Sequence, residues 1–457
     1  MADSPLRTLP RVDHLAARLP PAIPRPLATD IARATLAAAR EAVLQALGRG
    51  GPVPACDLDH LAATASETAA AMLAPRLRPV LNATGIVLHT NLGRAPLPPL
   101  SPAALGASNL EYDLATGERG SRTALVAPLL AALTGAEAGV AVNNATAALM
   151  LAVAAASRAS LDGAIEVVVS RGELVEIGDS FRLPDVLASA GVKLREVGTT
   201  NRTTLADYAA ALAPRPAAVL RVYPSNYRIV GFTESPPIPD LASLTSAAGV
   251  PLIVDVGSDP LTPLALPPEK PSARALVAAG ADLVLFSGDK EAGGPQAGLI
   301  VGRESLVAHV RRHPWMRAMR VDKLRLDALL GVLQIHLRGA GGTLPTHLAL
   351  NATPAELATR ARAFVARLAD PRLTVVPTDD AVGGGAHPGT PLPGAGVHVA
   401  TSRARDLTAR LRAGEPAVVG RVDDGGVTLS LRAIPPEQDV GLGDALKRAL
   451  DTLPPAR

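Results

Sequence analysis

Seven short apolar runs, separated by segments long enough for a helix, constrain the fold of this chain more than any other feature. They are residues 139–142, 165–169, 192–197, 217–222, 252–256, 283–286 and 299–301. Apolar runs without polar alternation are typical of strands buried on both faces, and their separation by helix-length segments favours a parallel sheet. We therefore predict an open, mostly parallel α/β sheet with ligand chemistry at the ends of its strands.

The segments on either side of this sheet pattern have a different character. The first is rich in alanine and proline and has helical patterns at Ile31–Leu47 and Leu58–Leu73. Near the C-terminus, a helical pattern at Pro354–Leu368 precedes four strand candidates, the last two of which form a hairpin around Asp423 and Gly426. We predict three domains, which are a helical N-terminal domain (1–78), a large catalytic domain (79–340) and a small α+β C-terminal domain (341–457).

The composition limits the class of protein. The chain has 457 residues, 48% of them hydrophobic, so it can bury a large core. Its formal net charge of +3 gives no global signal of nucleic-acid binding. One cysteine, Cys56, excludes a disulfide framework and a metal site with several thiolates, and no metal site is predicted. Because we find neither a signal-peptide core nor an apolar run long enough for a bilayer, we expect a cytoplasmic protein without membrane contact.

A lysine lies in a tight turn between two of the apolar runs. Leu283–Phe286 leads into Ser287-Gly288-Asp289-Lys290, and the next apolar run begins at Gly298. Burying an ammonium group costs on the order of several kcal/mol unless the group is paired or loses its proton. An unprotonated lysine is what Schiff-base chemistry requires, so Lys290 is the candidate catalytic residue. Of the other lysines, we expect Lys270 to lie in a polar loop.

Several motifs resemble one known family. They are NATGIVLHTNLGRAPL (Asn82–Leu97), ERGSR (Glu118–Arg122), VGTTNRT (Val197–Thr203), and SGDK at residues 287–290 followed by GGPQAG at residues 293–298. From about Pro79 to the C-terminus, the chain resembles bacterial L-seryl-tRNA(Sec) selenium transferase, also called selenocysteine synthase. The resemblance implies a pyridoxal 5′-phosphate enzyme of the aspartate aminotransferase fold type, known as fold type I.

Besides the Lys290 turn, the segment after Val142 and Asp255 would suit this cofactor. A strand end at Val142 leads into an alanine-rich helix, where Asn143, Asn144, Ala145 and Thr146 would form a phosphate cradle, although an ordinary helix cap gives the same pattern.

Asp255 ends a strand and would pair with the pyridine nitrogen, although strand-end aspartates more often form turns. Ser287 is a second phosphate ligand candidate, and Asp289 could orient or tune the Lys290 amine. We expect the residue that stacks on the ring within Arg171–Arg182.

The resemblance also implies an activity and partners. Family members convert L-seryl-tRNA(Sec) to L-selenocysteinyl-tRNA(Sec) through a cofactor-bound dehydroalanyl intermediate, with selenophosphate as the selenium donor. The N-terminal domain would grip the tRNA, and the chains would form a homodecamer built from dimers with active sites between subunits. By position, Arg94, Arg317 and Arg320 would bind the anionic donor, a role that suits guanidinium groups. Arg317 and Arg320 could equally be part of a solvated basic helix face.

Two alternatives and one departure from the family pattern remain. A pyridoxal-phosphate lyase or ammonia-lyase of a small hydroxylated or phosphorylated amino acid would use the same lysine turn. A non-catalytic RNA-binding relative would require Lys290 to be incidental. Two apolar residues commonly follow this lysine in the family, whereas Glu291 follows it here. Glu291 would either repel an anionic substrate or point away from the site.

Overall fold

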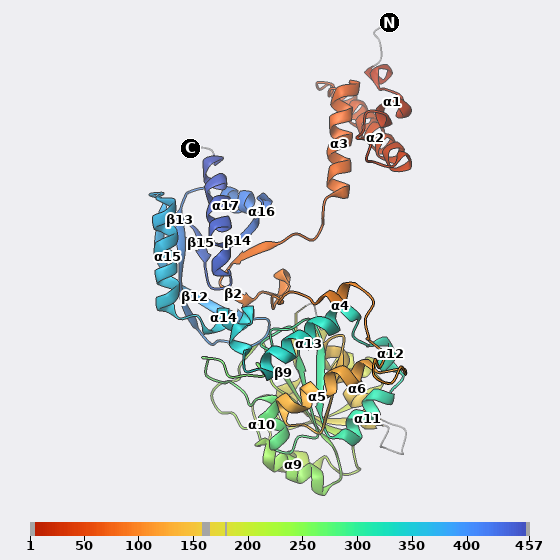
Figure 1. Ribbon diagram of the computed structural model, residues 1–457, viewed down its shortest axis with the longest axis vertical. Helices are drawn as coiled ribbons and strands as arrows, with labels where there is room; N and C mark the ends of the chain where they lie inside the picture. The colour runs from red at the N-terminus through yellow and green to blue at the C-terminus, as the bar shows by residue number, and fades with distance from the viewer. Residues whose placement is uncertain (1–4, 158–164, 179–180, 454–457) are drawn as a thin grey trace. The chain divides into compact units, whose positions relative to one another are not determined.

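The structure is a computed structural model that describes residues 5–157, 165–178 and 181–453 (Figure 1). The chain divides into two compact units, residues 1–79 and 80–457. Each unit has its own core. The three predicted domains stay a prediction, because the division into units does not separate the second domain from the third.

The first unit is helical. After a 3-10 turn, η1 (Pro5–Thr8), come α1 (Val12–Ala16), α2 (Arg25–Arg49) and α3 (Leu58–Leu73). Their core contains Leu15, Ile31 and Leu61. Helix α2 is longer than predicted at both ends, because a proline in its first turn favours the start and Gly50, with a left-handed backbone, ends it. Helix α3 has the predicted bounds.

A seven-stranded sheet forms the centre of the second unit, in the order β3-β11-β10-β9-β8-β4-β7. Its strands are β3 (Ala138–Val142), β4 (Ile165–Ser170), β7 (Val192–Val197), β8 (Ala218–Val222), β9 (Leu252–Ser258), β10 (Leu283–Ser287) and β11 (Gly298–Gly302). Every predicted apolar run forms one of these strands. Only β11 is antiparallel to its neighbours, so the predicted α/β fold with a mostly parallel sheet is confirmed.

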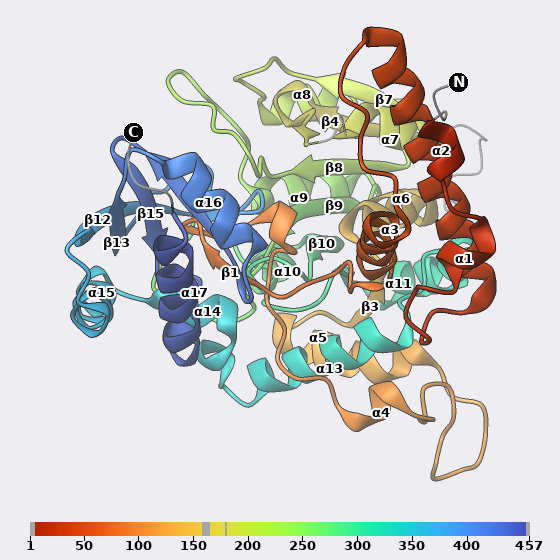
Figure 2. The same cartoon turned by 90° about the horizontal axis from the view of Figure 1, so that it is seen from above.

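Helices cover both faces of this sheet (Figure 2). On one face lie α5 (Arg122–Thr134), α8 (Leu205–Ala210), α9 (Ile238–Ala247), α10 (Ala273–Ala278) and α13 (Lys323–Leu337). On the other lie α6 (Ala145–Ser157), α7 (Leu183–Ser189) and α11 (Glu304–Arg312). On β9, Leu252 and Val254 pack on the first face and Ile253 on the second, as expected for a strand buried on both sides.

A second sheet has six strands in the order β1-β14-β15-β13-β12-β2. They are β1 (Val80–Ala83), β2 (Ile86–Leu88), β12 (Leu373–Gly383), β13 (Leu392–Ala400), β14 (Ala417–Asp423) and β15 (Gly426–Ser430). Helices α15 (Pro354–Leu368), α16 (Ala404–Ala413) and α17 (Asp439–Asp451) pack on it. The predicted helix and hairpin are confirmed. Strands β1 and β2, however, join this C-terminal sheet and not the large one.

Shorter elements connect these layers. They are η2 (Thr90–Leu92), α4 (Pro102–Leu105), η3 (Arg171–Glu173), the pair β5 (Glu176–Ile177) and β6 (Phe181–Arg182), α12 (Trp315–Ala318), η4 (Gly341–Thr343), α14 (Pro345–Asn351) and η5 (Pro436–Gln438). Among the helices of the described ranges, none has both the length and the apolar character needed to span a membrane.

Candidate active site

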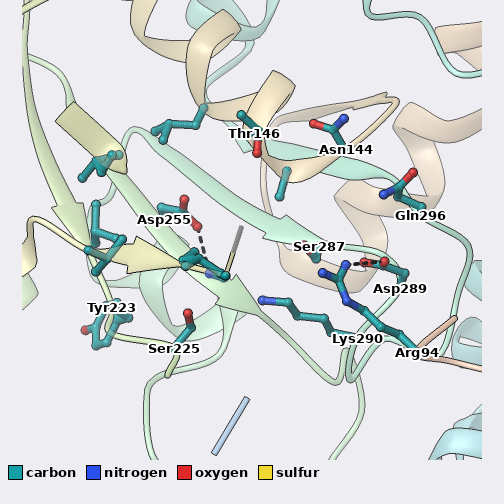
Figure 3. A pocket seen from close by; sticks show the side chains of 18 residues that line it. Arg94, Asn144, Thr146, Tyr223, Ser225, Asp255, Ser287, Asp289, Lys290 and Gln296 are labelled. Atoms are coloured by element: carbon teal, nitrogen blue, oxygen red, sulfur yellow. Dashed lines mark hydrogen bonds and ion pairs between the residues drawn. The ribbon is translucent and has the colours of Figure 1, made fainter. Parts of the chain in front are cut away.

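A cavity of about 280 Å³ lies where β8, β9 and β10 end and α6 begins (Figure 3). Because parallel strands end at the same edge of a sheet, residues that are far apart in the chain meet there. Most predicted site residues line this cavity, namely Arg94, Asn144, Ala145, Thr146, Asp255, Ser287, Asp289 and Lys290.

Lys290 is held in a closed turn between β10 and β11. The N–H of Gly288 donates to the carbonyl of Ala297 at 2.9 Å, and the N–H of Gly293 donates to the carbonyl of Lys290 at 2.9 Å. A Cβ atom on Gly288 would lie 2.8 Å from the carbonyl oxygen of Pro295, so this turn requires glycine. The Lys290 side chain is 7% exposed and points into the cavity (Figure 3).

The surroundings of Lys290 favour its unprotonated form. Burial lowers the pKa of Lys290 from 10.5 to about 8. Lys270 and Arg94 act in the same direction, whereas Asp255 and Asp289 oppose it. Near neutral pH a fraction of the amine is therefore free to act as a nucleophile or as a general base.

Asp255 fits the role of partner to a protonated ring nitrogen. Its Oδ1 accepts a hydrogen bond from the N–H of Gly257 at 2.9 Å. Burial raises the pKa of Asp255, while Gly257 and Lys290 lower it. A cation placed against this carboxylate in the cavity would offset the cost of burial, and the protonated nitrogen of pyridoxal phosphate is such a cation.

The start of α6 fits a phosphate group. Oδ1 of Asn144 accepts from the N–H of Ala147 at 2.8 Å and thereby caps the helix. The N–H groups of Ala145 and Thr146 have no acceptor within the helix, because they belong to its first turn, and both residues line the cavity. A Cβ on Gly298 would lie 2.1 Å from the Asn144 carbonyl oxygen, so glycine is needed where β11 passes this helix start.

Asp289 and Arg94 form an ion pair in the cavity wall. Nη1 of Arg94 donates to Oδ2 of Asp289 at 2.7 Å. The backbone φ of Arg94 is 59°, a value that residues other than glycine rarely adopt. Its buried Nε has no hydrogen-bond partner among the described residues. Backbone strain together with an unused donor is typical of a ligand-binding residue. Asp289 therefore contacts Arg94 directly, and its charge raises the pKa of Lys290.

Three predicted residues do not line this cavity. Arg317 and Arg320 line a separate cavity of about 560 Å³, where Arg320 donates to Glu111 at 2.9 Å. The backbone N–H of Asn143 donates to Met319 at 2.9 Å, and Asn143 is absent from the described lining of the Lys290 cavity. Within one chain, the structure therefore does not bring these side chains to Lys290.

Other residues complete the cavity without having been predicted individually. They are Leu149, Val175, Ile177, Gly178, Leu183, Val222, Tyr223, Ser225, Gly257 and Gln296. Val175, Ile177 and Gly178 belong to the segment in which a ring-stacking residue was expected, and they give an apolar wall. Residues 179–180 of that segment lie outside the described residues. Tyr223 directly follows β8, and its place at the end of a buried strand beside β9 could have indicated it.

Glu291 points away from this cavity. This was one of the two outcomes expected for it, the other being repulsion of an anionic substrate. Its side chain lines another cavity, of about 790 Å³, and is 2% exposed. Oε1 accepts from Nε2 of His387 at 2.8 Å, and Oε2 lies 3.9 Å from Nζ of Lys270. Lys270 lies in a loop, as predicted, and its side chain is only 12% exposed.

The chain is similar over almost its whole length to named transferases. The family model of L-seryl-tRNA selenium transferase matches residues 80–435. An L-seryl-tRNA(Sec) selenium transferase of Nitratidesulfovibrio vulgaris is 42% identical over 470 residues, which cover 97% of this chain and 98% of the relative. One of Geobacter metallireducens is 45% identical over 392 residues, covering 82% of this chain and 84% of the relative.

A solved structure is similar as well. That of a D-glucosaminate-6-phosphate ammonia-lyase has a TM-score of 0.58 and 26% identity, and the match covers 82% of this chain and 96% of that chain. Together with the match to the transferase family, this likeness confirms the predicted fold type and the predicted pyridoxal 5′-phosphate cofactor. The chain belongs to the L-seryl-tRNA selenium transferase family.

Proposed function

We propose that this protein converts L-seryl-tRNA(Sec) to L-selenocysteinyl-tRNA(Sec) with selenophosphate as the donor. One observation carries the proposal: Lys290, Asp255 and the start of α6 line one cavity in a chain of this family. The non-catalytic alternative requires an incidental Lys290, and the closed turn and the lowered pKa of its amine argue against that.

The residues of the cavity divide the work among them. Pyridoxal phosphate, when bound, supplies a ring that withdraws electrons from the α-carbon of the seryl group. Asp255 would hold the proton on the ring nitrogen, and the N–H groups of Ala145 and Thr146 with the hydroxyl of Ser287 would hold the phosphate. Lys290 would bind the cofactor covalently, take the proton from the α-carbon and later return a proton.

Arg94 is the residue of this cavity best suited to the anionic donor. The seryl group is esterified to tRNA and so has no free carboxylate for an arginine to bind. The free Nε of Arg94 and its pair with Asp289 leave a guanidinium group oriented and incompletely satisfied. We propose that Arg94 binds selenophosphate and that Asp289 positions Arg94.

We further propose that Arg317 and Arg320 reach the donor across a subunit interface. Within one chain they line a separate cavity with Arg119 and Arg122. They would act with Lys290 only if this cavity faces the Lys290 cavity of another copy, as a homo-oligomer built from dimers, such as the expected decamer, would allow.

Mixing two inactive variants should then restore activity. When Lys290→Ala and the double variant Arg317→Ala/Arg320→Ala are dissociated and reassembled in equal amounts, half of the dimers are mixed. Each mixed dimer has one intact site, so about a quarter of the wild-type selenium-transfer rate is expected. The control is Lys290→Ala mixed with the triple variant Lys290→Ala/Arg317→Ala/Arg320→Ala. This mixture has no Lys290 and so cannot form an intact site. If mixed oligomers purified through two tags stayed inactive, sharing of the site would be disproved.

We propose that the helical unit of residues 1–79 binds tRNA. Helix α2 exposes Arg25, Arg33 and Arg40, which can contact phosphates. Deleting residues 1–79 should weaken binding of seryl-tRNA(Sec) at least about tenfold, while the visible absorption of the cofactor stays. Filter binding at fixed salt measures the affinity for the tRNA, and a visible spectrum measures the absorption of the bound cofactor. Unchanged tRNA affinity would assign tRNA recognition to residues 80–457 instead.

Transfer of labelled selenium tests the function itself. Purified protein is incubated with seryl-tRNA(Sec) and labelled selenophosphate, and the tRNA fraction is counted. Label in that fraction is expected. If the cofactor is bound and no label appears, the second candidate function becomes the better one, a lyase of a small hydroxylated or phosphorylated amino acid. The likeness to the D-glucosaminate-6-phosphate ammonia-lyase favours that candidate, and screening such amino acids would test it.

We infer that the protein works in the cytoplasm. Its proposed substrate is a charged tRNA, and its single cysteine, Cys56, is buried and free. A free thiol in place of a disulfide suits a reducing compartment.

A further inference from the structure

The cavity of about 790 Å³ has no role in the proposed chemistry. It lies between the loop that joins β9 to α10 and Glu291, the residue that directly follows Lys290. Its volume is in the range of small-molecule sites, which are mostly apolar with a few polar groups. The apolar wall consists of Leu133, Leu261, Leu264, Leu266 and several prolines. The polar groups include those of Lys270, Glu291 and His387.

The loop between β9 and α10 holds this cavity open. Residues 259–272 contain five prolines, which restrict the backbone. The carboxylate of Asp259 accepts from the N–H of Leu261 at 2.7 Å and from the N–H of Ala273. In the middle of the loop, the N–H of Ala265 donates to Oδ1 of Asn351 at 2.9 Å. Because the loop is fixed at both ends and at its centre, the cavity is formed before any ligand binds.

Two residues of the cavity wall have a strained backbone. The φ of Leu261 is 59° and that of His387 is 51°, values that residues other than glycine rarely adopt. Such strain costs stability and tends to occur at ligand-binding sites. Since both residues line the cavity, the strain is concentrated where a ligand would be held.

Two buried polar atoms of the wall have no hydrogen-bond partner among the described residues. They are Oε2 of Glu291 and Nδ1 of His387. Glu291 is 2% exposed and His387 is 8% exposed. The other carboxylate oxygen of Glu291, Oε1, accepts from Nε2 of His387 at 2.8 Å and is therefore satisfied. Because an unpaired buried polar atom is costly, Oε2 requires a hydrogen-bond donor from within the cavity.

Lys270 defines the kind of group that fits beside Oε2 of Glu291. Its Nζ lies 3.9 Å from Oε2, which is too far for a hydrogen bond. An oxygen atom placed about 2.8 Å from each of them would bridge the gap. A hydroxyl group can accept from Nζ and donate to Oε2 at once. A carboxylate cannot donate and would face the carboxylate of Glu291, whereas an ammonium group cannot accept from Nζ.

We propose that this cavity binds a small uncharged molecule with an apolar body and a terminal hydroxyl group, which bridges Lys270 and Glu291. The apolar body would lie against the leucines of the wall. The described linings of this cavity and of the Lys290 cavity share no residue, so this is a second ligand site. The inference does not depend on the proposed function.

Binding of four related probes to the full-length holoenzyme tests the proposal, since the cofactor then fills the Lys290 cavity. The probes are 3-phenylpropan-1-ol, its methyl ether, 3-phenylpropanoate and the trimethylammonium analogue, which cannot react with the cofactor. Ligand-observed NMR titration gives each Kd. The alcohol should bind with a Kd of about 1 mM or lower. The other three should bind at least about tenfold more weakly, because they displace water without reproducing both of its hydrogen bonds.

Two variants locate the site. Ala275 is an exposed residue of α10 that lines the cavity, so Ala275→Trp should fill it and weaken binding of the alcohol at least about tenfold. The matched control is Ala355→Trp, at an exposed alanine of α15 outside the described lining, and it should keep the wild-type Kd. Lys270→Met/Glu291→Gln removes the bridged pair, so the alcohol should lose its advantage over the ether. This double variant decides the question if Ala275→Trp fails to fold.

An alcohol that failed to bind, or that bound no more tightly than its ether or the charged probes, would overturn the proposal. So would an unchanged Kd in folded Ala275→Trp, because the probe would then bind elsewhere. A preference for the alcohol that persisted in the double variant would also overturn it. Binding needs neither tRNA nor selenium, so a failure of the proposed function in the selenium-transfer assay would be seen separately from this result.

Discussion

Replacing Lys290 with alanine is expected to lower the rate of selenium transfer by about a thousandfold or more, while seryl-tRNA binding stays close to wild type. The variant loses both the covalent attachment of the cofactor and the general base, and a base alone contributes about a hundredfold to ten-thousandfold. Single-turnover transfer of labelled selenium measures the first effect, and filter binding of the tRNA measures the second.

Lys447→Ala provides the control for this experiment, since it removes an exposed lysine from α17. It should transfer selenium at the wild-type rate. Turnover by Lys290→Ala within a few-fold of wild type would refute the assignment of the reaction to this lysine. Loss of tRNA binding together with activity would instead indicate misfolding, which circular dichroism would reveal.

Asp255→Asn should lower the rate of selenium transfer by about a hundredfold to a thousandfold. The amide has nearly the same shape as the carboxylate but no charge, so the ring nitrogen would lose the partner that keeps it protonated. The cavity would still hold the cofactor through Lys290 and the start of α6. We therefore expect the loss in kcat and expect cofactor binding, measured by its visible absorption, to weaken much less.

The matched control is Asp424→Asn, the same chemical change in the exposed turn between β14 and β15. It should leave kcat unchanged. If Asp255→Asn kept the wild-type kcat, the carboxylate could not be the partner of the ring nitrogen.

Local patterns predicted the large sheet well. Leu283–Phe286 and most of the other apolar runs are buried on both faces, so their sequence carries the strand signal without help from tertiary contacts. Val192–Val197 forms the edge strand β7, where Lys193 and Glu196 are exposed. The turn at Lys290 was equally readable, because its glycines are required by close backbone contacts.

The pairing of strands that are far apart in the sequence could not be predicted from local patterns. Strands β1 and β2 pair with β14 and β12, more than two hundred residues further along the chain, and nothing local in them indicates that partner. The same limit applies to Lys270. Its prolines and neighbours indicate a polar loop, and only the tertiary fold places its ammonium group 3.9 Å from Glu291.

The pairing of β2 with the C-terminal sheet has a mechanical consequence for the cavity. Arg94 follows β2 by a few residues and is thus tethered to the C-terminal sheet, whereas Lys290 extends from β10 of the large sheet. The 2.7 Å contact between Arg94 and Asp289 ties the two together. The N–H of Ala95 also donates to the carbonyl of Asp289 at 3.4 Å, so a hinge motion between the sheets would load both of these contacts. A change in the angle between the sheets would then alter the gap between Arg94 and Lys290.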